Sequence, residues 1–283
     1  MTAAHFDTYE DYPPGMAEEA RKLCLHVAAI LGDFRDELVL VGGLVPYLLV
    51  DQEANDVRTH VGTRDLDIGL SIAVLDSERY RSISEGLRNA GFKPAEKNDG
   101  TIRRQMWRSP ISSITIDFLI APTDTGPGGG KLQNLESDFA AIVTPALPLA
   151  FLDCIDVLLE GELPNGARIQ RSVRVCGPAA FVILKAHAMM GRLKRKDAYD
   201  LVYMLQYYGQ GTSDIAKRFD LIAGSTNATK ALDILRNEFA AIDYRGPQDV
   251  AEFQTGRVDP IIQADAWGTV QEFLDLVHQT DTE

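Results

Sequence analysis

Several features that mark particular classes of protein are scarce or missing in this sequence. Its three cysteines lie far apart, at Cys24, Cys154 and Cys176, so we expect neither a disulfide framework nor a Cys/His zinc site. The longest apolar stretch, residues 38–50, has 13 residues, whereas a bilayer span needs about 20. The first residues lack the basic segment and apolar core of a secretory signal. We therefore expect a cytoplasmic protein with reduced thiols and no membrane partner.

An excess of positive charge is also missing. The chain has 28 Lys and Arg against 41 Asp and Glu, a net charge of −13, which excludes non-specific attraction to nucleic acid over the whole surface. A local basic groove is still possible. Six arginines can either follow an RNA backbone or pair with the many acids, and the sequence leaves both interpretations open. They are Arg103, Arg104, Arg108, Arg168, Arg171 and Arg174.

Two segments alternate polar and apolar residues with the period of a half-buried strand, at residues 65–72 and 113–120. Asp65 and Asp67 share the polar face of the first segment, and Asp117 lies on the second. If the strands are neighbours, three carboxylates converge, and a divalent cation such as Mg²⁺ is the usual means of relieving their repulsion. We predict that Asp65 and Asp67 bind a metal. Asp117 is either a third ligand or a general base, and the alternative is a solvated acidic strand face.

A pair of glycines, Gly42-Gly43, follows a short buried strand at residues 38–41 and precedes an expected helix at 44–50. Glycine permits a positive φ and close approach of a ligand to the backbone, and a helix start offers unpaired N–H groups to an anion. The pair is therefore a candidate phosphate-binding turn. The alternative is an ordinary tight turn.

The pattern of the chain changes after Gly177-Pro178. Before it, helical spacing at residues 16–31 and 77–90 is interspersed with strands, and a 103–107 strand pairs with one at 112–121. After it, only helices are expected, at residues 179–190, 197–207, 214–222, 228–239 and 261–278. We predict an α/β (α+β) domain with a small mixed sheet at residues 1–177, followed by a helical bundle domain at 178–283.

A basic segment opens the predicted helical domain. Residues 185–196 contain five Lys and Arg within twelve residues, and a helix can direct Lys185 toward a triphosphate. Asp197 and Asp200 are three residues apart and share a helix face. The alternative is structural: Lys196 and Asp197 begin a solvated helix, and Asp200 pairs with a nearby Arg to hold the domains.

The glycine pair, Asp65-x-Asp67 and the later acidic strand together resemble the polymerase-β-like nucleotidyltransferase superfamily. Lys185, Arg192 and the run from Lys194 to Asp200 resemble the signature of the AbiEii/AbiGii-type toxins, which include the MenT-like enzymes. The resemblance covers roughly residues 38–205. The 21 residues between Gly43 and Asp65 exceed the usual spacing, so the polar loop 52–63 is expected to be an insertion.

The resemblance implies a Mg²⁺-dependent transfer of a nucleoside monophosphate from an NTP to an acceptor hydroxyl. The acceptor implied is the tRNA 3′ end, within a toxin–antitoxin or phage-defence system that has a possible antitoxin partner. It implies metal binding by Asp65 and Asp67, and active-site roles for Asp117, Lys185 and Asp200. Contacts to the nucleotide are implied for Gly42, Gly43, Thr63, Arg64 and Lys185. Alternatives are a small-molecule acceptor such as an aminoglycoside, which the acidic charge favours, a protein hydroxyl, or a non-catalytic nucleotide- or partner-binding protein.

Overall fold

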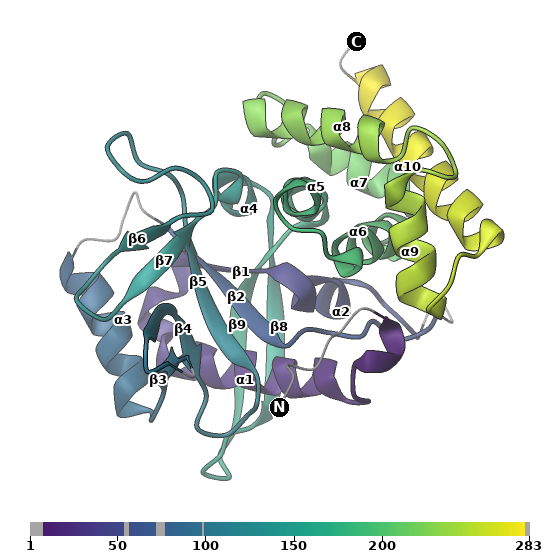
Figure 1. The fold of residues 1–283 in the computed structure, drawn as a ribbon. Coiled ribbons are helices and arrows are strands. Elements are labelled where there is room, and N and C mark those ends of the chain that lie inside the picture. Colours follow the sequence, from purple (N-terminus) through teal and green to yellow (C-terminus); the bar gives the residue numbers. More distant parts are fainter. Residues whose placement is uncertain (1–7, 54–56, 72–76, 98, 281–283) are drawn as a thin grey trace. The chain divides into compact units, whose positions relative to one another are not determined.

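The computed structural model describes residues 8–53, 57–71, 77–97 and 99–280, and its elements are labelled in Figure 1. The chain divides into two compact units. The sheet unit contains residues 15–45 and the described parts of 62–176. The helical unit contains the described parts of residues 1–14, 46–61 and 177–283. Each unit is therefore assembled from separate segments of the chain.

The sheet unit contains one mixed sheet, which has nine strands among the described residues. These are β1 (Leu38–Val41), β2 (Asp65–Leu70), β3 (Lys93–Glu96), β4 (Ile102–Arg108), β5 (Thr115–Ile120), β6 (Leu132–Asn134), β7 (Ala140–Val143), β8 (Cys154–Glu162) and β9 (Arg168–Cys176). The main order is β3-β4-β5-β2-β1-β9-β8, and β7 pairs with both β5 and β6. β2 is parallel to β5 and β1 is parallel to β9, whereas β2 is antiparallel to β1.

The apolar face of the sheet packs against helix α1 (Met16–Ile30), which contacts β2, β8 and β9. Alternation along β2 sends Leu66 and Ile68 into this core, where both are buried, and Asp65 and Asp67 to the opposite face. Helix α3 (Ser77–Asn89) contacts α1. The sheet unit also contains the short helices η2 (Gly32–Glu37), η3 (Gly42–Leu44) and α4 (Leu147–Leu152).

Helix α4 covers one end of the acid-bearing face of β2. A Cβ added to Gly69, which follows Asp65 and Asp67 at the strand period of two, would meet the side chain of Leu147 from α4. Glycine at this position therefore lets α4 lie directly on the end of the strand. The carboxylates lie at the other end of the same face.

The helical unit is a bundle with six longer helices among its described residues. They are α5 (Pro178–Gly191), α6 (Arg195–Tyr207), α7 (Thr212–Phe219), α8 (Thr226–Glu238), α9 (Arg245–Thr255) and α10 (Pro260–Thr280). α5 contacts α6, α7 and α8, while α9 packs against α6 and α10. Fully buried phenylalanines from four of these helices form much of the core. The short η1 (Tyr9–Asp11) contacts α9, and α2 (Val45–Leu49) begins at the last sheet-unit residue before the chain enters the helical unit.

Residues 57–61 belong to the helical unit because they are bound to α6. The hydroxyl of Tyr203 donates a 3.2 Å hydrogen bond to the carbonyl of Arg58. The ring of His60 stacks on that of Tyr199, with 5.4 Å between centroids. The backbone N–H of His60 donates a hydrogen bond to Oε1 of Gln52, and this bond links two positions of the same loop.

The predicted fold class, an α/β core with a mixed sheet followed by a helical bundle, is confirmed. The division of the chain differs from the predicted domains 1–177 and 178–283. The change at Gly177 lies at the expected place, but residues 8–14 and the described part of 46–61 group with the helices. Elements with no counterpart among the predicted ones include β3, β6, β7, β8, α4 and α9. No helix among the described residues is both long and apolar enough to cross a bilayer.

Candidate active site

Three carboxylates from two neighbouring strands meet on the face of the sheet opposite the apolar core. β2 and β5 run parallel in a register that pairs Asp67 with Asp117 and Asp65 with Thr115. Paired residues of neighbouring strands point to the same face, so both strands direct their acids the same way. One oxygen from each of Asp65, Asp67 and Asp117 lies within 4.8 Å of the others. Asp117 is buried, while Asp65 and Asp67 are half-buried.

This donor set fits a hard divalent cation. Carboxylate oxygens are the ligands that Mg²⁺ prefers, and this ion usually binds one or two protein carboxylates together with substrate phosphates. Three anions this close, one of them buried, repel one another when no cation lies among them. Clustered exposed acids do occur without a metal, but here two local features of the chain hold the carboxylates in place.

The first feature that holds the carboxylates is the turn after β1. Gly42 has a φ of +77°, which disfavours any residue with a Cβ, and an added Cβ would overlap the carboxylate of Asp67. Gly42 and the buried Gly43 form the start of η3. The glycine pair therefore lies directly beside the acidic cluster, as the candidate phosphate-binding turn requires.

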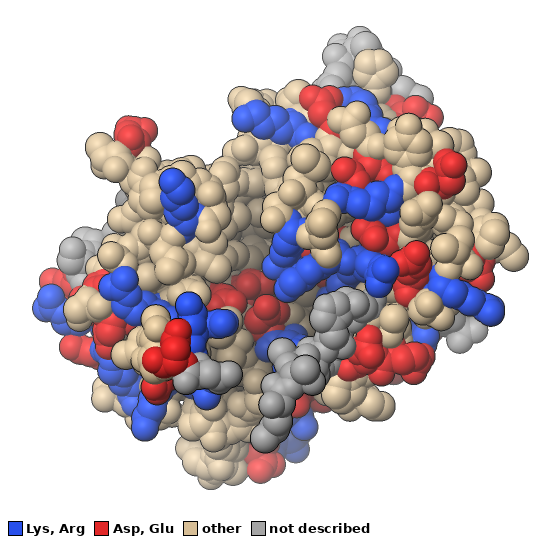
Figure 2. Space-filling model, in the orientation of Figure 1, with Lys and Arg blue, Asp and Glu red and all other residues tan. Residues whose placement is uncertain are grey.

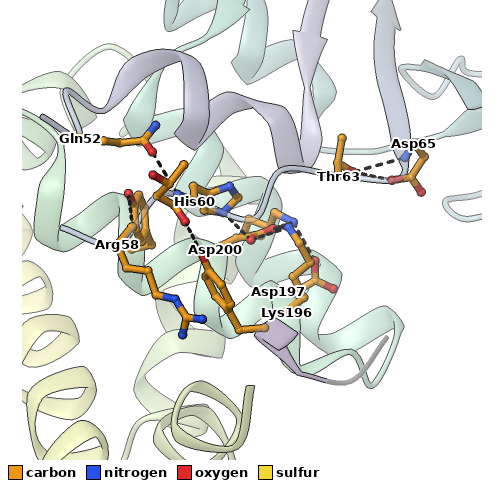
Figure 3. A network of polar contacts seen from close by, with 12 residues as sticks. Gln52, Arg58, His60, Thr63, Asp65, Lys196, Asp197 and Asp200 are labelled. Carbon is orange, nitrogen blue, oxygen red and sulfur yellow. Dashed lines mark hydrogen bonds and ion pairs between the residues drawn. The ribbon is translucent and has the colours of Figure 1, made fainter. Parts of the chain in front are cut away.

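The second feature is the pair of residues that precedes β2, Thr63 and Arg64. Thr63 is buried, and its Oγ1 donates a 2.7 Å hydrogen bond to Oδ1 of Asp65 (Figure 3). This bond fixes the orientation of one carboxylate, so Thr63 acts here on Asp65. Arg64 is exposed, and its carbonyl accepts a hydrogen bond from the N–H of Thr115 on β5.

A second polar cluster lies within the helical unit, where Lys185 of α5 binds two carboxylates of α6. Its Nζ lies 2.9 Å from Asp197 and 2.6 Å from Asp200. Asp200 also binds Lys196 at 2.7 Å and accepts a 2.9 Å hydrogen bond from Nε2 of His60 (Figure 3). Arg192 completes the cluster with a 2.8 Å ion pair to Asp197.

A comparison with known protein families gives one match over most of the chain. Residues 27–277 match the family model described as nucleotidyl transferase AbiEii toxin, type IV TA system. The chain belongs to the AbiEii toxin family. The recognised resemblance is thereby confirmed, and the coarse activity, nucleotidyl transfer, follows from family membership.

Two further comparisons, with curated proteins and with solved structures, add no family assignment. No curated protein matches the chain. A solved structure that matches is the solution structure of the antibiotic-resistance factor ANT(2″)-Ia. Its sequence is 15% identical, the match covers 77% of this chain and 97% of that one, and the TM-score is 0.39.

In this AbiEii-family chain the predicted site residues fall into two groups. Gly42, Gly43, Thr63 and Arg64 lie on the two segments that flank the acidic cluster of the sheet unit. Lys185 and Asp200 lie in the buried cluster of the helical unit, where Asp200 has no exposed surface at all. The partners observed for Asp200 are two lysines and a histidine rather than the arginine that the structural alternative invoked.

The electrostatics of the buried cluster favour a fixed arrangement. Burial by itself raises the pKa of Asp200, but Lys185 and Lys196 outweigh it and hold that pKa well below its usual range. Burial likewise opposes the charge of Lys185, yet Asp197 and Asp200 raise the pKa of its ammonium group. Lys185 and its two carboxylate partners, Asp197 and Asp200, are therefore charged at neutral pH, whereas burial lowers the pKa of Lys196.

His60 is the member of this cluster that the sequence did not single out. It is one of five scattered histidines, and it lies in a polar loop 140 residues from Asp200. Burial lowers the pKa of His60 to about 4, so the ring is neutral at physiological pH. No local sequence pattern connects His60 with Asp200, because the contact forms only when residues 57–61 pack against α6 in the folded protein.

Proposed function

We propose that the protein is a Mg²⁺-dependent nucleotidyltransferase that moves a nucleoside monophosphate from an NTP to the 3′-terminal hydroxyl of tRNA. In this proposal it is the toxin of a toxin–antitoxin or phage-defence system and has a cognate antitoxin. The observation that carries the proposal is the cluster of Asp65, Asp67 and Asp117 beside the Gly42 turn. Membership of the AbiEii family supports the reaction class.

In the proposed reaction the acceptor oxygen bonds to the α-phosphorus as the bond from that phosphorus to the bridging oxygen breaks, and pyrophosphate leaves. Asp65 and Asp67 would hold the metal, with Thr63 fixing the orientation of Asp65. When bound, Mg²⁺ would supply neutralisation of the charge that develops on the phosphate oxygens. Asp117 is proposed to take the proton of the acceptor hydroxyl or to complete the ligand set, and its proximity to the other two carboxylates supports either role.

The turn at Gly42-Gly43 is proposed to receive the phosphates, because its backbone lies against Asp67 without an intervening side chain. For Lys185 and Asp200, the contacts within the helical unit support a positioning role better than direct contact with the triphosphate. Each already has oppositely charged partners, and both are buried.

The test uses purified protein, Mg²⁺ and each of the four α-labelled NTPs, incubated separately with tRNA, with a protein mixture and with an aminoglycoside. Label should enter the tRNA 3′ end with wild type and should not with Asp67→Asn. Label in the aminoglycoside or in protein would show that the acceptor is not tRNA, while the reaction would still be nucleotidyl transfer. Nucleotide binding without label in any acceptor would favour a non-catalytic role.

A further inference from the structure

Strand β4 carries arginines next to the acidic cluster. It is antiparallel to β5, in a register that pairs Met106 with Asp117 and Arg108 with Thr115. Thr115 in turn pairs with Asp65 on β2, so Asp65, Thr115 and Arg108 form one row across three strands. Residues in such a row share a face, and strands are about 4.8 Å apart, so the backbones of Arg108 and Asp65 are about 10 Å apart.

A hollow lies over the same part of the sheet, where β3 and β4 pair. Its volume is about 450 Å³. Three cations and two acids line it together with Met106, namely Lys97, Arg103 and Arg108 with Glu96 and Asp99. Because Met106 is paired with Asp117, the hollow begins next to the carboxylates. Figure 2 shows Lys and Arg side chains gathered with a few acids over the region of β3 and β4.

The arginines of β4 differ from most others in the chain because they have no carboxylate partner among the described residues. Arg103 contacts the sulfur of Met106 at 4.0 Å, Arg104 donates to the carbonyl of Ser137, and Arg108 donates to the carbonyl of Glu96. By contrast, Arg81 and Arg88 of the neighbouring α3 pair with Glu136 and Asp138.

These arginines therefore keep their positive charge without a carboxylate partner among the described residues, in a chain with 41 acids and 28 Lys and Arg. A guanidinium has five N–H donors in a planar fork that matches a phosphate, and most of those on Arg103 and Arg108 have no partner in the part of the chain that is described. Such donors beside a nucleotidyl-transfer centre are suited to a phosphodiester and repel a polycationic small molecule.

We propose that the β4 surface, defined as Lys97, Arg103 and Arg108, binds the phosphate backbone of a polynucleotide acceptor and directs its end to the acidic cluster. This inference rests on the proposed function and assigns the acceptor class to a specific surface. Met106 provides an apolar contact between the cations and Asp117, where the last sugar or base of the acceptor would lie.

The experiment compares Arg103→Gln/Arg108→Gln with a matched control, Arg168→Gln/Arg171→Gln. The control removes the same charge from exposed arginines of β9, which also have no ion pair among the described residues and lie beyond β1 from the acids. Binding of fluorescent tRNA to each full-length protein is measured by anisotropy from 0.05 to 0.5 M salt. Circular dichroism and thermal melting check that each variant is folded.

We expect the β4 variant to bind tRNA roughly 10- to 30-fold more weakly at 0.15 M salt, with a salt slope lower by about 1.4 to 1.8, as two lost phosphate contacts predict. The KM for NTP should stay unchanged. Arg103→Lys/Arg108→Lys should keep most of the salt slope, because it keeps the charge, and if the glutamine variant does not fold the Lys97→Gln/Arg108→Gln variant takes its place.

The result that overturns the inference is equal tRNA affinity and equal salt slope for wild type and the β4 variant, or an equal loss in the β9 control. In that case transfer to tRNA by wild type would leave the proposed function intact. If wild type labels only a small molecule, the tRNA acceptor of the proposed function is wrong. The β4 variant should in that case bind a cationic acceptor more tightly, because it has lost two positive charges.

Discussion

Gly42 and Asp67 lie so close that the space for a Cβ on the glycine is already occupied by the carboxylate of the aspartate. The contact links the turn after β1 with the strand next to it, where Val41 pairs with Asp67. The acidic cluster therefore depends on the absence of a side chain as much as on the presence of three carboxylates.

Replacement of Gly42 by alanine should displace Asp67 and reduce nucleotidyl transfer by at least about 100-fold, the usual effect of an ångström-scale shift in a reactive group. The matched control is Gly130→Ala, because Gly130 also has a φ of +77° but has open space where the new methyl group would lie. Both variants carry the same backbone strain. Transfer by Gly42→Ala at the level of the Gly130→Ala control would show that the position of Asp67 does not matter.

Removal of one acid from the cluster should stabilise the metal-free protein. In EDTA, Asp67→Asn and Asp117→Asn should each raise the melting temperature by about 2 to 4 °C, since relief of like-charge repulsion at this spacing contributes about 1 kcal/mol. Added Mg²⁺ should stabilise wild type and not Asp67→Asn, and it should fail to stabilise Asp117→Asn only if Asp117 is a ligand rather than the general base. Asp124→Asn, at an exposed loop position, is the control and should change neither value. If Mg²⁺ leaves the melting curve of wild type unchanged, the metal assignment is wrong.

Asp200→Asn should lower the free energy of unfolding by about 3 to 5 kcal/mol, because it leaves Lys196 without its carboxylate partner and the buried Lys185 with one carboxylate in place of two. The double variant Lys185→Met/Asp200→Leu should recover part of that loss. Urea denaturation measures both. If Asp200→Asn is as stable as wild type but cannot transfer a nucleotide, a direct active-site role would replace the positioning role.

The stability of the protein should fall as the pH drops from 7 toward 4. Burial lowers the pKa of His60 to about 4 in the folded state. Between this value and about 6.5 the unfolded chain takes up a proton that the folded chain does not, so acidification favours unfolding. The loss from His60 should reach about 2 kcal/mol between pH 7.5 and pH 5.

Urea denaturation of wild type and His60→Gln at several pH values checks this expectation. Burial also lowers the pKa of His26, but that residue contributes equally in both proteins. The variant should therefore show a shallower dependence on pH. The same slope in both proteins would mean that His60 is not protonated on unfolding in this range.

The acidic cluster was predictable because it depends on the shortest-range rule of strand geometry. The period of two places Asp65 and Asp67 on one face, and a second acidic strand suggested where Asp117 would lie. The parallel pairing of β2 with β5 was only a condition in that argument, since no local pattern sets the register of strands whose paired residues lie 50 positions apart in the chain. The structure supplies that register.

Other features were beyond the reach of local patterns. Helix α9 was missed because Gly246-Pro247 at its start is typical of a turn, although proline is well tolerated in a first helical turn. Strands β3, β6 and β7 have only three or four residues each, too few to show a period. The role of His60 depends on a contact with Asp200, which lies 140 residues away in the sequence. The close approach of Gly42 to Asp67 depends on tertiary packing.

The chain passes from one unit to the other four times, after residues 14, 45, 61 and 176. No single cut can therefore release either unit whole, and a fragment that begins at Gly177 would contain Asp200 without the histidine that binds it. During synthesis His60 leaves the ribosome 140 residues ahead of Asp200. Completion of the helical unit must wait until the intervening sheet has been made, so the acidic cluster can form before the bundle does.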